Sequence, residues 1–290
     1  MRTSVIVPAY RAWDTLPAAL EALRPQVERA DRELVLVESS GVAADVLQRR
    51  WPWARVLALP QRTLPGRARN LGAREAHGEL LAFTDADAIA EPQWLDELER
   101  ALAPGIDAVA GAVLNGTPRS AIGTADYLLE FSDWQPRRLT PPLHGATCNL
   151  LLRRSVLERE GFPEELWPGE DTILTFPLGK AGRLAFAPRA RIRHHGRTRL
   201  ADFVRHHRRL GSSFASVCAL VPFPRRALIR PRYAPLLPAL RFVAVALRLR
   251  GNRPALARAL AISPLLLVGA VAWTVGLVRQ TGGVPPSATT

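Results

Sequence analysis

Short apolar runs alternate along the first hundred residues with stretches in which apolar side chains recur every three or four positions. The runs lie at residues 5–7, 34–37, 56–59 and 80–83, and the helical spacing is seen at Trp13, Leu16, Leu20 and Leu23 and over residues 67–76 and 92–102. This alternation predicts an α/β domain in which helices cover a mostly parallel sheet. In such sheets ligands bind beyond the carboxyl ends of the strands, so the residues just after each strand are candidate site residues.

The alternation loosens after about residue 112. Residues 145–153 have the pattern of a strand and residues 154–160 that of a helix, whereas residues 161–182 are rich in glycine, proline and acidic residues. That composition predicts a loop region facing the substrate.

The most apolar segment lies near the carboxyl end. Residues 259–278 are 20 residues without a charge, between Arg258 and Arg279. A helix of this length spans about 30 Å, the thickness of the apolar part of a bilayer. We therefore predict a transmembrane helix at about 259–278, with a buried core helix as the alternative.

A second apolar segment, residues 234–247, has 14 residues and contains Arg241, so it is too short to cross comfortably. Arginines lie on both sides of it: Arg225, Arg226, Arg230, Arg232, Arg248, Arg250, Arg253 and Arg258. Basic clusters near membrane segments favour the cytosolic side, so we expect this segment to lie in the membrane interface against anionic lipids. A solvated basic face of a soluble protein is the alternative.

The net charge of +13 is distributed unevenly. Residues 1–182 carry 20 basic and 25 acidic side chains, whereas residues 183–290 carry 19 basic side chains and one acid, Asp202. We expect a catalytic domain at residues 1–210 and a basic, membrane-associated helical region at residues 211–290. The two cysteines, Cys148 and Cys218, form no metal-binding or disulfide pattern, and no secretory signal precedes the first strand.

Two carboxylates, Asp85 and Asp87, follow the apolar strand at residues 80–83. At the turn that leaves a strand, both can reach a hard cation and a diphosphate bound to it. An isolated pair with this spacing is common, and taken by itself it is more often explained by a helix-capping turn before Pro92.

Further motifs give the pair a context. In chain order they are residues 4–10 (SVIVPAY), 66–72 (GRARNLG), 83–87 (FTDAD), 145–154 (GATCNLLLRR), 161–163 (GFP), 169–171 (GED) and 188–194 (PRARIRH). This ordered series resembles the family 2 glycosyltransferases of the GT-A fold over residues 3 to about 210. The fold expected from the resemblance is a GT-A-like, mostly parallel sheet with flanking helices.

The resemblance implies a metal-dependent, inverting transfer of a sugar from a nucleotide-sugar donor. Mg²⁺ or Mn²⁺ would bind to Asp87, Asp85 and, as a third ligand, His194, although an isolated histidine is more often structural. Asp171, or in second place Glu170, would take the proton from the acceptor hydroxyl. An acidic surface loop is the alternative for this pair of acids.

The donor would contact the ends of the first strands and the helix after them. The candidates are Pro8, Ala9, Tyr10, Glu38, Arg69, Asn70 and Asp85. Arg69 would pair with a phosphate or a carboxylate. The family usually has paired aspartates where this chain has Glu38-Ser39, so the identity of the nucleotide stays open.

The predicted acceptor is a lipid-linked or membrane-proximal glycan, at a cell membrane with the catalytic domain on the cytoplasmic side. No Gln-x-x-Arg-Trp motif is present, which argues against a processive polymer synthase. A nucleotidyltransferase of similar fold is an alternative, but the glycine-rich, lysine-containing signature that it would have near the first strand is missing. A non-enzymatic basic adaptor is another alternative, and we expect no nucleic-acid partner because few aromatics accompany the basic residues.

Overall fold

The computed structural model describes residues 2–29, 31–138, 141–222 and 231–281. The chain divides into two compact units. The first consists of residues 1–116, 134–136 and 140–195, and the second of residues 117–133, 137–139 and 196–290. The predicted boundary at residue 210 is a different division, because the second unit begins earlier and includes a segment from the middle of the chain.

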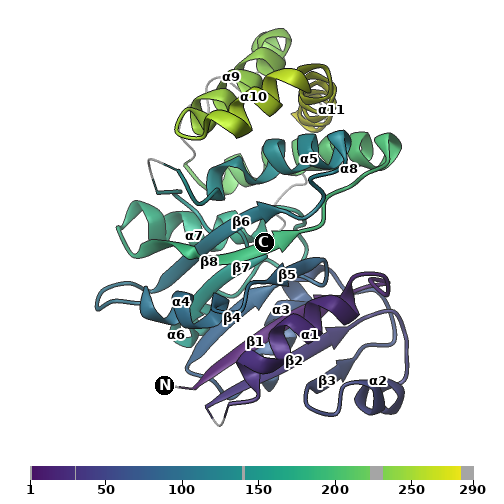
Figure 1. Cartoon of the computed structure of the whole chain (residues 1–290), viewed down its shortest axis with the longest axis vertical. Helices are drawn as coiled ribbons and strands as arrows, with labels where there is room; N and C mark the ends of the chain where they lie inside the picture. The colour runs from purple at the N-terminus through teal and green to yellow at the C-terminus, as the bar shows by residue number, and fades with distance from the viewer. Residues whose placement is uncertain (1, 30, 139–140, 223–230, 282–290) are drawn as a thin grey trace, which may run out of the picture. The chain divides into compact units, whose positions relative to one another are not determined.

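The first unit is built on an eight-stranded sheet in the order β3-β2-β1-β4-β7-β6-β8-β5. Figure 1 shows β3, β2 and β1 in the lower part of the view. The strands are β1 Thr3–Ala9, β2 Arg32–Glu38, β3 Arg55–Ala58, β4 Leu80–Thr84, β5 Ala88–Ala90, β6 Ala108–Asn115, β7 Asn149–Arg153 and β8 Leu184–His194. The strands β1 to β4 are parallel to one another, β7 is antiparallel to β4 and β6, and β5 is antiparallel to β8. The mostly parallel α/β sheet predicted from the sequence is confirmed.

Six helices accompany these strands in the described part of the first unit. They are α1 Leu16–Val27, α2 Ala44–Arg50, α3 Pro65–Glu75, α4 Trp94–Arg100, α6 Arg154–Glu160 and α7 Glu170–Lys180. The helix α3 lies close to the sheet at Gly72, where an added Cβ would come within 2.7 Å of Ile6 Cγ2 and 2.9 Å of Val37 Cγ2. Glycine at this position therefore allows α3 to pack directly on β1 and β2.

The sheet register brings the predicted site residues together in two places. Ala9 at the end of β1 lies opposite Glu38 at the end of β2. Ala88, the first residue of β5, lies opposite His194, the last residue of β8, which places the histidine beside the turn that contains Asp85 and Asp87.

The second unit is helical. Its helices are α5 Ala121–Phe131, α8 Leu200–Leu220, α9 Leu237–Leu249, α10 Arg253–Ala261 and α11 Ser263–Thr281, with the 3₁₀ turn η3 at Pro231–Leu236 before α9; a further 3₁₀ turn, η1 at Ser132–Trp134, follows α5. Leu129 of α5, Phe203 of α8, Val245 of α9 and Leu266 of α11 belong to one buried cluster. This cluster is the core of the second unit.

The helices α8 and α11 pack backbone to backbone and run parallel. A Cβ added at Gly211 would lie 1.8 Å from the carbonyl oxygen of Trp273, and one added at Gly276 would lie 1.9 Å from that of Arg208. Gly269, earlier in α11, faces the ring of Phe203 near the start of α8. The start of α8 thus meets the first half of α11 and the middle of α8 meets the second half, so the two helices run in the same direction.

Two sequence-based expectations change here. Residues 161–182 were expected to be a loop, but residues 170–180 form α7, so Glu170 and Asp171 open a helix. The predicted helix at 259–278 is divided, because α10 ends at Ala261 and α11 begins at Ser263, with Pro264 in its first turn where proline needs no helical hydrogen bond.

One described helix, over residues 263–280, is long and apolar enough to cross a membrane, and 44% of that window is buried within the protein. Length and composition alone are weak evidence for a membrane span. Arg225, Arg226 and Arg230 lie outside the described residues.

Candidate active site

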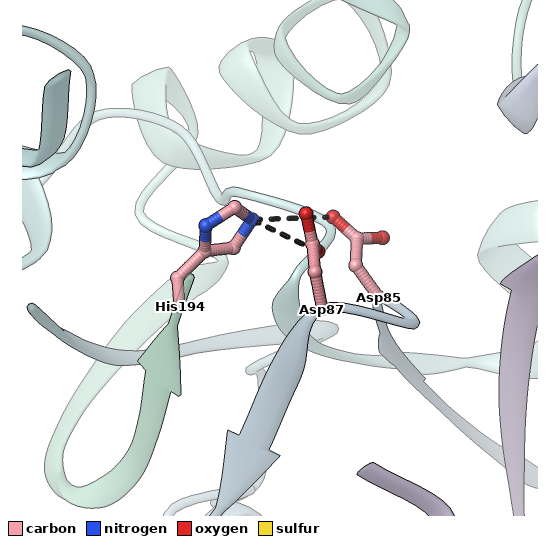
Figure 2. A group of neighbouring side chains, drawn as sticks. All are labelled: Asp85, Asp87 and His194. Carbon is pink, nitrogen blue, oxygen red and sulfur yellow. Dashed lines mark ion pairs between the residues drawn. The ribbon is translucent and has the colours of Figure 1, made fainter. Parts of the chain in front are cut away.

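Asp85, Asp87 and His194 lie together at the carboxyl end of β4 (Figure 2). His194 Nε2 is 3.3 Å from a carboxylate oxygen of Asp87 and 4.0 Å from one of Asp85. One ligand atom from each of the three side chains lies within 4.8 Å of the other two. The side chain of His194 is buried, whereas those of Asp85 and Asp87 are 27% and 36% exposed. The group therefore opens to solvent on the side of the carboxylates.

The strand ends fix this geometry. The strand β4 stops at Thr84, and a turn closed by the Ala88 N–H donating to the Asp85 carbonyl leads into β5. The antiparallel pairing of β5 with β8 then aligns Ala88 with His194, and the His195 N–H donates to the Asp87 carbonyl. The histidine thus reaches the two aspartates across about a hundred residues of sequence because its strand is their neighbour in the sheet.

This donor set fits a divalent cation. Carboxylate oxygens are the usual ligands of Mg²⁺ and Mn²⁺, and an imidazole nitrogen is compatible with Mn²⁺. The histidine nitrogen points at both carboxylates (Figure 2), as it would if all three shared an ion. Three ligands leave coordination positions for phosphate oxygens or water.

Arg69 connects this group to the start of α7. Its Nη2 donates to Asp85 at 2.8 Å and its Nη1 donates to Glu170 at 2.6 Å. The guanidinium is buried, as is the carboxylate of Glu170. We expected Arg69 to pair with a phosphate or a carboxylate, and it pairs with two carboxylates; the alternative of a solvated arginine does not apply.

Glu170 and Asp171 are the first two residues of α7 and have different surroundings. Glu170 is buried against Arg69, and burial raises its pKa to about 7 even though the positive charge of Arg69 acts in the opposite direction. Burial also raises the pKa of Asp171, which Arg69 and hydrogen bonds from the backbone of Thr147 and Thr172 oppose. Both acids therefore bind a proton more readily than ordinary carboxyl groups.

Asp171 is the more accessible of the two acids, because it is partly exposed whereas Glu170 is buried. Its Oδ1 accepts from the backbone N–H of Thr172 at 2.6 Å and from the Thr172 hydroxyl at 3.2 Å, and its Oδ2 accepts from the Thr147 N–H at 3.3 Å. These bonds fix the orientation of the carboxylate. Asp171 is thus suited to accept a proton from a bound hydroxyl group.

Asn70 makes three hydrogen bonds within the protein. Its Nδ2 donates to the Phe162 carbonyl at 2.9 Å and to Glu164 at 3.0 Å, and its Oδ1 accepts from the Phe162 N–H at 3.0 Å. The amide is therefore used within the protein, and donor binding by Asn70 stays a prediction. Asn70 holds the segment that leads to α7.

The other predicted donor residues lie at the ends of β1 and β2. Pro8 and Ala9 are the last residues of β1, and Tyr10, 38% exposed, follows them with the Arg62 guanidinium 5.1 Å from its ring centroid. Glu38 closes β2; its Oε2 accepts from the Ser40 N–H at 2.9 Å, while its buried Oε1 has no hydrogen-bond partner in the described residues. A buried acceptor without a partner is energetically costly, which marks Oε1 as a group that a ligand N–H can satisfy.

A second group of ionisable side chains, not anticipated from the sequence, lies within the helical unit. Asp126 accepts from His207 at 3.0 Å, and Glu130 pairs with His206 at 2.8 Å. The Arg197 guanidinium is 3.5 Å from Asp126 and 3.4 Å from Glu130. A cation is already in place between these carboxylates, so we interpret the group as an internal charge network that connects α5 to α8.

Comparison with known proteins shows the family of the chain. The family model described as Glycosyl transferase family 2 matches residues 4–161, which is more than half of the chain. This chain belongs to glycosyl transferase family 2. The matched region of the family 2 domain contains Glu38, Arg69, Asp85 and Asp87, and it ends before Asp171 and His194.

Among curated proteins, the chain is 29% identical to "Glycosyltransferase AglE" of Haloferax volcanii over 194 residues, covering 63% of this chain and 64% of that protein. It is 30% identical to human "Polypeptide N-acetylgalactosaminyltransferase 15" over 142 residues, covering 43% and 22%, and 27% identical to the "Pre-mycofactocin glycosyltransferase" of Mycobacterium tuberculosis over 176 residues, covering 58% and 37%. The chain thus spans less than two thirds of the length of these relatives.

Among solved structures, the chain is similar to the mannosyltransferase PcManGT from Pyrobaculum calidifontis in complex with GDP-Man and Mn²⁺, with a TM-score of 0.58, 22% identity and coverage of 97% of this chain and 86% of that one. It is also similar to glucosyl-3-phosphoglycerate synthase from Mycobacterium tuberculosis with Mn²⁺, UDP and glucosyl-3-phosphoglycerate, with a TM-score of 0.54, 20% identity and coverage of 78% and 81%. These likenesses establish the GT-A-like fold.

Sequence reasoning brought together the three candidate metal ligands but missed the residues that hold the acids in place. Thr147 and Thr172 orient Asp171, and Phe162 and Glu164 bind Asn70. All four lie in or beside the motifs at residues 145–154, 161–163 and 169–171. Their position in these motifs was the available signal, but backbone hydrogen bonding cannot be read from side-chain identity.

Proposed function

We propose that this protein is a metal-dependent, inverting glycosyltransferase that moves a sugar from a nucleoside-diphosphate donor to a hydroxyl group of a lipid-linked or membrane-proximal acceptor. The observation that carries the proposal is the connection made by Arg69, which joins the acid–histidine group at Asp85 to the paired acids at the start of α7. A site for a diphosphate-bound cation and a candidate base are thereby held by one buried side chain.

Asp85, Asp87 and His194 would hold the cation. A divalent cation at this position neutralises the diphosphate as it leaves. Glu38 Oε1, Ala9 and Tyr10 lie at the adjacent strand ends, where the nucleoside would bind beyond the carboxyl edge of the sheet. The free acceptor of Glu38 would take an N–H of the base.

Asp171 would take the proton of the acceptor hydroxyl. As the acceptor oxygen bonds to the anomeric carbon, the bond from that carbon to the diphosphate oxygen breaks on the opposite face, which inverts the configuration. Glu170 would act through its contact with Arg69, because it is buried and already accepts from that guanidinium. Asp171 is partly exposed, which supports it as the group that meets the substrate.

The helical unit supports the proposed acceptor and the proposed location. Its basic, apolar composition supports attachment to a membrane with anionic lipids, and the arginine-rich flanks support the cytoplasmic face. An enzyme held there would meet acceptors whose hydroxyl or phosphate groups project from the bilayer.

The first experiment is hydrolysis of a panel of nucleotide sugars in detergent with Mn²⁺ or Mg²⁺. The unaltered chain is compared with Asp87→Ala, Asp171→Asn and Glu170→Gln. We expect metal-dependent hydrolysis of one donor, its loss in Asp87→Ala, and loss of transfer to an added acceptor in Asp171→Asn.

The variants also separate the two acids. If Asp171→Asn kept transfer activity while Glu170→Gln lost it, the base would be Glu170. If no donor bound or turned over at any metal concentration, the proposed reaction would be wrong.

A further inference from the structure

The charged side chains of the helix α9 contact other parts of the helical unit. The Arg241 guanidinium lies 4.3 Å from the centroid of the Trp273 ring on α11 and donates to the Leu129 carbonyl of α5 at 3.4 Å. Arg248, two turns later, pairs with Asp133 at 2.8 Å. Both arginines in the body of the helix therefore face the protein.

The outer face of α9 and the residue before it is apolar. Leu236, Leu240, Val243 and Leu247 are 57%, 44%, 50% and 58% exposed and recur at helical spacing. A helix on the surface of a water-soluble protein has the opposite arrangement, with apolar residues inward and charges outward. The arrangement in α9 is the one expected of a helix whose outer face meets an apolar medium.

The helix α11 has a second stripe of the same kind. Leu267, Val268, Val271 and Val275 are 43%, 41%, 48% and 39% exposed. The residues on the other face of the helix, among them Leu266, Ala270, Trp273 and Leu277, are buried. No charged residue interrupts the helix before Arg279. Contiguous exposed apolar residues of this extent mark an interaction surface.

The charges around the stripes indicate the occupant. Exposed arginines lie at or beside the helix ends: Arg232, Arg250, Arg253, Arg258 and Arg279. Residues 203–281 contain no aspartate or glutamate. A second copy of the chain would bring two such positive surfaces together, whereas anionic lipid headgroups would neutralise one. Apolar stripes with an arginine border therefore fit an anionic membrane.

The packing of α8 against α11 decides the orientation. Because the two helices run in parallel contact through Gly211 and Gly276, a membrane-crossing α11 would take α8 into the bilayer with it. The helix α8 has exposed arginines at positions 205, 208 and 209, level with the second half of α11. Arginine is strongly disfavoured in the centre of a bilayer, so this pair of helices is not built to cross it.

We propose that the helical unit attaches to an anionic membrane from one side, with the apolar stripes of α9 and α11 inserted at the level where headgroups meet acyl chains and the helix axes lying in the membrane plane. This replaces the crossing helix expected from length and composition. Membrane binding by these stripes does not depend on the transfer reaction. Either proposal, sugar transfer or in-plane membrane attachment, can therefore fail without refuting the other.

The first test is flotation of the full-length protein with vesicles of phosphatidylcholine, with and without phosphatidylglycerol. We expect binding that increases with the anionic lipid. Leu240→Gln with Leu247→Gln, and separately Leu267→Gln with Val271→Gln, should each weaken binding about tenfold or more, because each pair removes two inserted apolar side chains.

The matched control is Val46→Gln on α2, since Val46 is 47% exposed in the first unit. It should bind vesicles as the unaltered protein does. Unchanged binding in both stripe variants would overturn the proposal, as would a protein that ignores vesicles and forms dimers that the stripe variants dissociate. Donor hydrolysis and circular dichroism show that each variant is folded.

The second test separates in-plane attachment from crossing. Val46→Cys and Gln280→Cys are labelled in sealed membrane vesicles with a maleimide that does not cross the bilayer. Attachment from one side predicts that both positions are reactive or both are protected, whichever way the vesicles are oriented. Reactivity of only one of them before detergent is added would mean that α11 crosses.

Discussion

Arg69 Nη1 donates to Glu170 Oε1 at 2.6 Å, a buried contact between residues 101 positions apart in the chain. The same guanidinium donates to Asp85, so three ionisable groups share one site in which Arg69 and Glu170 are buried. Removing one partner of a buried ion pair leaves the other charges uncompensated, which is far more costly than losing an exposed pair.

Replacing Arg69 by methionine should therefore lower the free energy of unfolding by about 3–5 kcal/mol. Arg69→Lys, which keeps the charge but cannot donate to both carboxylates in a planar fork, should keep more of the stability and still lose donor hydrolysis. Urea unfolding and the hydrolysis assay measure the two effects. The control is Arg67→Met, since Arg67 is 58% exposed; equal losses in both methionine variants would contradict this account.

The metal site gives a prediction that does not depend on turnover. Mn²⁺ should stabilise the protein against urea by about 2.7 kcal/mol at a hundred times its dissociation constant, because only the folded chain assembles the three ligands. His194→Gln should lose most of this stabilisation. His195→Gln changes the adjacent, exposed histidine and should keep it, so equal behaviour of the two variants would argue against His194 as a ligand.

The unpaired oxygen of Glu38 predicts a role in nucleotide binding. Glu38→Gln should weaken binding of the nucleoside diphosphate by about 1–3 kcal/mol, because a buried carboxylate that accepts from the base becomes an amide. Calorimetric titration with UDP and GDP measures this difference and identifies the preferred base. Asp45→Asn, at a carboxylate that is 64% exposed, is the control. Unchanged affinity in Glu38→Gln would mean that Oε1 does not face the nucleotide.

Buried His207 makes stability depend on pH. Burial lowers its pKa below the ordinary 6.5, in spite of the neighbouring Asp126 and Glu130 carboxylates, and its Nδ1 has no partner in the described residues. Protonation would bury an N–H without an acceptor, so the unfolded chain takes up the proton first. The contribution of His207 to stability should be full above about pH 6.5 and fall below it, by up to about 1.4 kcal/mol for each pH unit.

Urea unfolding at about pH 7.5 and about pH 5.5 checks this effect in the unaltered chain and in His207→Gln. The variant lacks the titrating ring and should show a smaller loss between the two pH values. The neighbouring carboxylate of Asp126 has a lowered pKa, so its own contribution is lost only at more acidic pH. An equal loss in both proteins would assign the pH dependence to other groups.

Much of the sheet was predictable because its strands are buried and strongly apolar. The runs at residues 5–7, 34–37 and 80–83 correspond to β1, β2 and β4. The helix α7 was missed because glycine and proline before it, together with Glu170 and Asp171, indicate a loop locally. Those acids occupy the first turn of the helix, where negative charge is favourable.

At the site, the sequence predicted which residues group together better than it predicted their surroundings. Asp85, Asp87 and His194 could be grouped from the order of the motifs, but the burial of Arg69 could not, since the same residue type at the start of a helix is usually solvated. Its environment depends on Glu170, which tertiary packing brings to it. The inward direction of Arg241 could not be predicted for the same reason. The sequence shows an arginine within an apolar segment, but its contact with the ring of Trp273 depends on tertiary packing.

Two consecutive residues of α3 hold the two ends of one segment: Asn70 binds Phe162, and Arg69 binds Glu170. Residues 163–169 are therefore a loop attached at both ends to a single helical turn. Glu164, which also binds Asn70, and Gly169, whose φ of 112° favours glycine, are fixed by the structure, but the other positions can change in sequence without displacing the acids that follow the loop. We expect related enzymes to have diversified their acceptor preference within these other positions, with the chemistry kept constant by the helix that anchors the loop.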